Sequence, residues 1–260
     1  MKKNIKKEEI KNLIDNGFSV KEMCKELCIS KRTLYNRFKE FGLSLIKPIP
    51  KFNINVFDSI DTEEKAYWLG FLYADGYVSK RNNQVELSLK GEDISHLMKF
   101  FNFLKDKRDP SFIKTSKVKL GNKIFERCRY IIGNKHFHNR LCELGCIPNK
   151  SLILTFPDLN IFKYEHLIYD FIRGYVDGDG NISPSRGYIQ ISIFGTENFL
   201  LGIRKYFPDF SYPKKDKRSN VFFIRSSHKK AEKISSKLYK NATIFLDRKY
   251  SKFAELCRNI

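Results

Sequence analysis

Two short stretches of the sequence combine an amphipathic helix pattern with a terminal aspartate and glycine. They span residues 68–76 and 172–180, and their aspartates are Asp75 and Asp179. A helix C-terminus already carries partial negative charge, so two such ends brought together with two carboxylates would repel each other. A divalent cation between the carboxylates would relieve that repulsion. Because carboxylate oxygens favour hard ions, the pair predicts a Mg²⁺ site.

Small residues are placed where they could bring the two aspartates together. Positions four apart lie on one face of a helix. In each stretch, glycine or alanine occupies such a pair: Gly70 with Ala74, and Gly174 with Gly178. Faces without bulky side chains let two helix backbones approach closely. We therefore expect the two helices to pack through these faces, with their aspartates side by side.

A repeat surrounds the two stretches. One helix ending in Asp-Gly is a common structural feature and would indicate little by itself. At the offset that separates Asp75 from Asp179, however, residues 85–91 (VELSLKG) align without a gap with residues 189–195 (IQISIFG). This match indicates an internal duplication.

Two such helices, each followed by a matching hairpin, resemble the LAGLIDADG homing endonucleases of the single-chain, two-motif type. The resemblance covers roughly residues 57–256. It implies a site-specific double-strand DNA endonuclease that hydrolyses phosphodiesters with Mg²⁺. The implied metal ligands are the carboxylates of Asp75 and Asp179, with the backbone carbonyls of Ala74 and Gly178 as further ligands.

Other positions of the motif are less regular. Its earlier acidic position is Asp177 in the second copy but Tyr73 in the first. We therefore expect a structural role for Asp177. The resemblance also implies a basic residue near each scissile phosphate, for which Lys150 and Lys249 are the candidates. Such a lysine could stabilise the charge that develops during hydrolysis. An ordinary surface position is an equally good interpretation of Lys150.

The composition favours a nucleic-acid partner. The formal net charge is +20, and hydrophobic residues make up 42% of the chain, which is adequate for a packed core. The sequence has no apolar run of transmembrane length and no signal peptide. We expect a cytoplasmic monomer that binds double-stranded DNA, with no membrane and no small-molecule cofactor, while an organellar or viral origin stays open.

The first residues form a separate module. Gly17 ends a first predicted helix, and Ser19 and Ser30 cap the next two. Residues 18–37 resemble the helix-turn-helix of resolvase-type domains, although Cys28 stands where such turns often carry glycine. An ordinary helical hairpin is the alternative. The predicted DNA-binding residues of the third helix are Lys31, Arg32, Thr33, Asn36 and Arg37.

The predicted fold class is α+β, with two pseudo-symmetric halves in which helices back an antiparallel, saddle-shaped sheet. We divide the chain into the helix-turn-helix domain (residues 1–45), a linker (46–56), a first half (57–158) and a second half (159–260). Asp61 is expected to cap the first motif helix, with Glu64 completing a capping box. Strands are expected at residues 77–79, 84–90, 113–120, 123–132, 181–183, 188–194 and 221–226.

Alternation along these strands predicts a DNA-reading sheet surface. Glu86 and Gln190 occupy matching positions, and their different hydrogen-bonding chemistry suggests a target that is an imperfect palindrome. The predicted contacts in the two halves are Arg81, Glu86, Lys90, Lys117, Lys119, Arg127, Arg129, Arg186, Gln190, Lys214, Lys215 and Arg225.

Other functions remain open at this stage. One is a transcription regulator that kept the fold but lost the chemistry, although the intact acidic pair argues against it. Another is an intron RNA maturase, although a helix-turn-helix favours duplex DNA because A-form RNA hides its major groove.

Six scattered cysteines include the spaced pairs Cys24/Cys28 and Cys142/Cys146. A zinc site is conceivable, but we expect free thiols.

Overall fold

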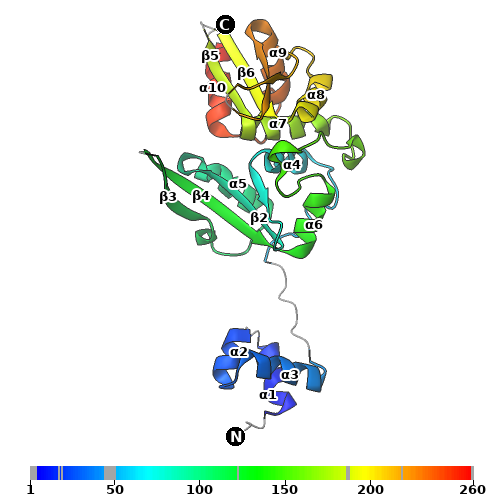
Figure 1. Cartoon of the computed structure of the whole chain (residues 1–260), viewed down its shortest axis with the longest axis vertical. Helices are drawn as coiled ribbons and strands as arrows, with labels where there is room; N and C mark the ends of the chain where they lie inside the picture. The colour runs from blue at the N-terminus through cyan, green and yellow to red at the C-terminus, as the bar shows by residue number, and fades with distance from the viewer. Residues whose placement is uncertain are drawn as a thin grey trace. The chain divides into compact units, whose positions relative to one another are not determined.

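The chain forms two compact units, which are described separately. The computed structural model describes residues 5–16, 18, 20–43, 51–121, 123–185, 188–217 and 219–258. The units are Met1–Pro50 and Lys51–Ile260 (Figure 1). None of the described helices has the length and apolar character needed to span a bilayer.

The smaller unit is helical in its described part. A buried cluster that includes Ile10, Met23 and Leu34 holds the helices together. The predicted cap at Ser30 is confirmed, since its hydroxyl accepts a hydrogen bond from the Thr33 backbone N–H at 3.1 Å. Gly17 and Ser19 lie outside the described residues. The helices are α1 (Lys7–Asp15), α2 (Val20–Glu26) and α3 (Lys31–Phe41).

The larger unit contains two four-stranded antiparallel sheets with the same strand order, which agrees with the internal duplication and confirms the predicted fold class. The first sheet has the order β1-β2-β4-β3 and the second β5-β6-β8-β7. The strands are β1 (Gly76–Val78), β2 (Gln84–Lys90), β3 (Lys114–Leu120), β4 (Lys123–Gly133), β5 (Gly180–Ser185), β6 (Tyr188–Gly195), β7 (Lys214–Lys215) and β8 (Phe222–Ser227).

One face of each sheet is buried by helices. Val85, Leu87 and Leu89 alternate into the core of the first half, as predicted from the sequence. Two helices, α4 (Glu63–Asp75) and α7 (Leu167–Asp179), lie side by side between the two sheets (Figure 1). The others are α5 (Ile94–Phe103), α6 (Lys135–Glu143), α8 (Glu197–Tyr206), α9 (His228–Tyr239) and α10 (Asp247–Arg258), with short 3₁₀ turns η1 (Gly91–Asp93), η2 (Pro110–Phe112), η3 (Lys150–Leu152) and η4 (Leu159–Ile161).

Some local expectations are wrong. The N-cap of α4 is Thr62, whose hydroxyl accepts from the Lys65 backbone N–H at 3.3 Å. Asp61 instead forms an ion pair with the Lys65 ammonium at 2.8 Å. The N-cap thus lies one residue after the predicted position, and Lys65 rather than Glu64 occupies the third helical position, where it cannot complete the predicted capping box. Strand β5 continues through Ser185, where the sequence favoured a loop from Pro184.

The described end of the predicted linker packs on the first half. The Asn53 backbone N–H donates to the Leu104 carbonyl at 2.8 Å, and Lys107 donates to the Lys51 carbonyl at 2.8 Å. Val56 is buried in the core. This stretch therefore belongs structurally to the larger unit, while residues 46–50 lie outside the described residues.

Candidate functional site

The two motif helices pack backbone to backbone. A Cβ added at Gly70 would lie 1.9 Å from the Phe171 carbonyl oxygen. A Cβ added at Gly178 would lie 2.3 Å from the Cβ of Ala74. The predicted packing through the small residues is therefore confirmed, and only glycine fits at these crossing points.

This packing places two carboxylates at one point. Asp75 ends α4 and Asp179 ends α7. Burial, and then the neighbouring Asp179 carboxylate, raise the pKa of Asp75 to about 6. Burial also raises the pKa of Asp179, although the charges of Lys150 and Lys249 act in the opposite direction. Two like charges held together in a buried site favour a bound cation or a proton.

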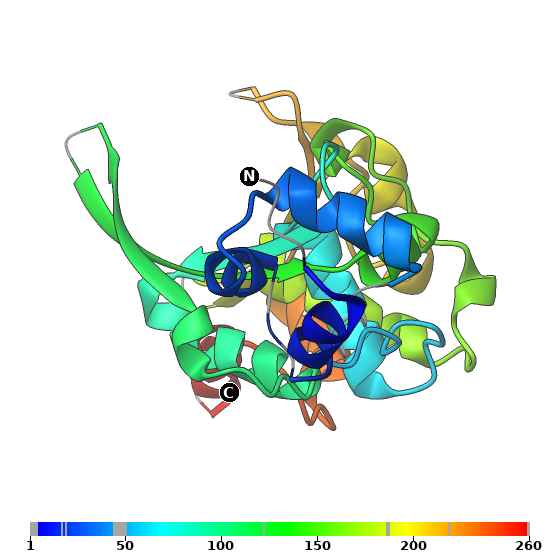
Figure 2. The same cartoon turned by 90° about the horizontal axis from the view of Figure 1, so that it is seen from below.

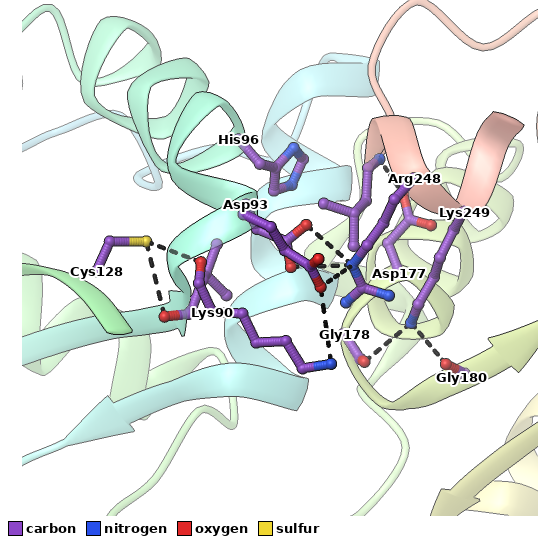
Figure 3. Close-up of polar contacts among 12 residues, drawn as sticks. Lys90, Asp93, His96, Cys128, Asp177, Gly178, Gly180, Arg248 and Lys249 are labelled. Carbon is purple, nitrogen blue, oxygen red and sulfur yellow. Dashed lines mark hydrogen bonds and ion pairs between the residues drawn. The ribbon is translucent and has the colours of Figure 1, made fainter. Parts of the chain in front are cut away.

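Two lysines flank the carboxylates in a pseudo-symmetric way. Lys249, on α10, is only 4% exposed. Its ammonium donates to the carbonyls of Val176 at 2.8 Å, Gly178 at 3.0 Å and Gly180 at 2.6 Å (Figure 3). Burial lowers the pKa of Lys249 to about 8.

The ammonium of Lys150 donates to the Gly76 carbonyl. Gly76 and Gly180 each follow a motif aspartate, so the two lysines take matching positions. Lys150 is half-buried.

The donor set fits a hard cation. Mg²⁺ in proteins is often held by one or two carboxylates and completed by substrate phosphates and water. Asp75 and Asp179 supply two carboxylates, and the predicted Gly178 carbonyl also accepts from Lys249. Among the described residues, no group of three or more His, Cys, Asp or Glu could hold a metal by itself. Backbone carbonyls, water or a substrate phosphate would supply the remaining ligands.

Five cysteines lie among the residues whose side chains are described. Their thiols form no disulfide, and within the described ranges none of them belongs to a cluster of side chains that could bind a metal ion. They are Cys24, Cys28, Cys128, Cys142 and Cys146.

Asp177 occupies a fully buried structural position. Its carboxylate accepts hydrogen bonds from the Tyr67 hydroxyl at 2.8 Å, the Tyr239 hydroxyl at 2.6 Å and the Leu246 backbone N–H at 2.8 Å. These donors come from α4, α9 and the segment before α10. Asp177 thus ties the two halves together, in agreement with its expected structural role. The long separation between these residues leaves no local sequence signal for the network.

No protein-family model and no curated protein matches this sequence. The structure of the homing endonuclease I-WcaI bound to its DNA recognition sequence matches with a TM-score of 0.53 and 15% identity, over 84% of this chain and 97% of that chain. The I-SmaMI LAGLIDADG homing endonuclease bound to cleaved DNA matches with a TM-score of 0.43 and 12% identity, over 74% and 87%.

The chain has the two-motif LAGLIDADG fold. In this fold the two motif helices are α4 and α7. Asp75 and Asp179 are the last residues of these helices, at the centre of the larger unit. At 15% identity the match with I-WcaI establishes the fold alone.

Charged contacts across the LAGLIDADG halves hold the segment that carries Lys249. The Arg248 guanidinium bonds the buried Asp93 carboxylate at 2.9 and 3.0 Å (Figure 3). Lys99 on α5 pairs with Asp247 at 2.7 Å and bonds the Phe245 carbonyl at 3.1 Å. Sequence reasoning missed Arg248, Asp93 and Lys99, and it did not anticipate helix α10.

The open face of the first sheet carries part of the predicted DNA surface. Glu86 and Lys90 alternate with the buried residues of β2, and Lys90 pairs with Arg127. Directly paired residues of antiparallel strands point to the same side. Arg127 and Arg129 therefore share the open face with Glu86 and Lys90. Arg81 is exposed in the turn that precedes β2.

The register separates the predicted basic set. Lys117 pairs with Glu126 and Lys119 pairs with Ile124. Arg127 directly follows Glu126 and pairs with Ser116. It therefore points to the opposite side from both lysines. Lys117 and Lys119 thus share one side of the ribbon and Arg127 and Arg129 share the other, because successive strand residues alternate between faces.

The second half presents a smaller polar face. Gln190 pairs with Ser183 and Ser227, and Arg225 pairs with Ser192, on the side away from the buried isoleucines of β6. Lys214 pairs with Phe223 on this open face, whereas Lys215 pairs with Phe222 on the other. Arg186 lies outside the described residues.

The five DNA-binding residues predicted in the smaller unit lie on α3. Lys31, Arg32 and Asn36 are exposed. Arg37 is half-buried and pairs with Glu40 at 2.6 Å, and the Thr33 hydroxyl shares a 2.9 Å hydrogen bond with Ser30. Three of the five residues thus project freely, and a DNA-binding role for α3 stays a prediction.

Proposed function

We propose that this chain is a site-specific endonuclease that cuts both strands of duplex DNA and depends on Mg²⁺. The observation that carries the proposal is the buried pair Asp75 and Asp179, with Lys150 and Lys249 beside them. A binding-only protein would gain nothing from two carboxylates that face a polyanion. The basic net charge of +20 supports an anionic substrate.

Each residue has a defined part in this proposal. The two aspartates would hold the cation, together with the carbonyls of Ala74 and Gly178. When bound, such a cation polarises a phosphodiester and stabilises the departing oxygen. Lys249 is fixed by three carbonyls, so its ammonium is held in one place beside Asp75 and Asp179. Preorganised positive charge of this kind stabilises negative charge that develops in the transition state.

The two halves would read different sequences. The Glu86 carboxylate can accept a hydrogen bond from cytosine. Gln190, at the matching position of the second half, can form two hydrogen bonds with adenine. The first half also has a long β3–β4 ribbon, whereas its counterpart β7 has only two residues. These differences support a target that is an imperfect palindrome. The similar structure of I-WcaI is itself bound to its DNA recognition sequence.

The deciding experiment is cleavage of a pooled library of random duplexes with Mg²⁺ and, separately, with EDTA. Metal-dependent double-strand cuts at one long site are expected. Asp179→Asn is the matched variant, since it keeps the side-chain shape and should bind the same site without cutting it. Sequence-specific binding with no cut in any metal would support a regulator instead. Preference for structured RNA over duplex DNA would support a maturase.

A further inference from the structure

The outer end of the β3–β4 ribbon combines exposed apolar side chains with basic neighbours. We call Val118, Ile124 and Phe125 the ribbon tip. They are 36%, 66% and 46% exposed. Single exposed apolar residues are common on protein surfaces. Three together on a two-stranded ribbon that extends beyond the rest of its sheet (Figure 2) require another explanation.

The strand register gives the ribbon tip two different faces. Phe125 pairs directly with Val118, and Ile124 pairs with Lys119. Because alternate residues of a strand share a face, Phe125 lies on the same side as Arg127 and Arg129. The buried Cys128 and Tyr130 on the other side show that this is the open face of the sheet. Phe125 therefore continues the row of arginines outward, whereas Ile124 points away from it.

Charge identifies the partner of this face. Lys114 pairs with Arg129 and Ser116 pairs with Arg127, so the open face of the ribbon is cationic up to the apolar pair. A cationic two-stranded ribbon matches the major groove of duplex DNA in width and charge. Within that groove, the apolar group that a base offers is the C5-methyl of thymine.

We propose that Phe125 and Val118 contact thymine methyl groups at the outer end of the DNA site read by the first half. This inference rests on the DNA binding in the proposed function. It adds a specificity element at the end of the longer ribbon of the first half, since β7 and β8 pair over only two positions in the second half. The arginines position the ribbon on the duplex, and the apolar pair distinguishes thymine from bases without a methyl group.

The test replaces single thymines by deoxyuridine, which removes only the methyl group. The probes are duplexes selected from a random library by the full chain in EDTA, so no cleavage is required. For the wild type, one or two replacements near one end of the selected site should weaken binding about fourfold each, as expected for one buried methyl. Phe125→Ala should lose the response at the thymine that Phe125 contacts, so that thymine and deoxyuridine at that position bind equally well.

Ile124→Ala is the matched control. It removes a neighbouring apolar side chain that is more exposed but lies on the opposite face, and it should retain the wild-type response to deoxyuridine. Circular dichroism of both variants checks that they fold. The proposal is overturned if Phe125→Ala keeps the response, if Ile124→Ala loses it, or if no thymine methyl matters. Absence of cleavage in Mg²⁺ would overturn the nuclease proposal yet leave this binding result intact.

Discussion

The backbone carbonyl of Tyr67 occupies the place that a side chain on Gly174 would need. A Cβ at residue 174 would lie 1.9 Å from that oxygen, and the same distance separates a Cβ at Gly70 from the Phe171 carbonyl oxygen. The two motif helices are therefore in contact through their backbones at two points. Any shift that makes room for a methyl group would also move Asp75 relative to Asp179.

Gly174→Ala should destabilise the larger unit by at least about 1–3 kcal/mol, because a methyl group cannot fit without separating α4 from α7. The urea unfolding midpoint measures this change. Gly133→Ala is the matched control, since the nearest side-chain atom to its added Cβ is Gln84 Cγ at 3.9 Å. Similar midpoints for the two variants would contradict the close helix contact.

Asp75→Asn should raise the melting temperature near pH 7.5 while cleavage is lost. Burial and Asp179 raise the pKa of Asp75 from 3.8 to about 6, so the folded state binds this proton more tightly than the unfolded chain. Between pH 3.8 and about 6, the free energy of unfolding of the wild type therefore falls as the pH rises. Above pH 6 it stays lowered by the cost of the buried charge. The increase in melting temperature that Asp75→Asn causes should therefore become smaller as the pH falls from 6 towards 4. Differential scanning fluorimetry across this range measures it.

Asp179→Asn provides the coupling control for that prediction. It removes the other member of the pair and should also raise the melting temperature at pH 7.5. Because each single change already relieves the same repulsion, the double variant should gain less than the two single gains combined. Strictly additive gains would show that the two carboxylates do not interact.

Lys249→Met and Lys150→Met should both reduce cleavage but differ in stability. Lys249 donates to three carbonyls in a buried place, so its loss leaves buried acceptors without a donor at a cost of about 1–3 kcal/mol. Lys150 is half-buried and bonds one carbonyl, so its removal should cost less. Thermal melts and cleavage assays on the same preparations separate the two effects. Equal destabilisation would contradict the difference in burial.

Cys28→Gly should stabilise the smaller unit by about 1 kcal/mol, because Cys28 has φ of 51°, a conformation unfavourable for residues with a Cβ. Cys24→Gly is the control, since it places glycine inside α2 and should destabilise by about 1 kcal/mol. Native-state hydrogen exchange of α2 and α3 in the full chain measures both changes. Slower exchange with Cys24→Gly than with Cys28→Gly would refute the assignment of strain to the turn.

Several parts of the fold depend on local patterns and could be predicted from the residues alone. The spacing of Gly70 and Ala74 specified which helix face could accept another backbone, and the alternation of Val85, Leu87 and Leu89 specified the buried sheet face. The repeat of both patterns at one offset determined that the halves share a strand order. Local periodicity carries this information because helices and strands present fixed sets of residues to one side.

Contacts between groups that are distant in the chain could not be predicted in this way. The burial of Lys249 depends on carbonyls of the second motif helix and the strand after it, far away in the chain. The opposite sides taken by Lys119 and Arg127 follow from the pairing register of β3 with β4. Such contacts depend on packing and register between separate elements, and a shift of one residue would reverse a strand's faces without changing its local pattern.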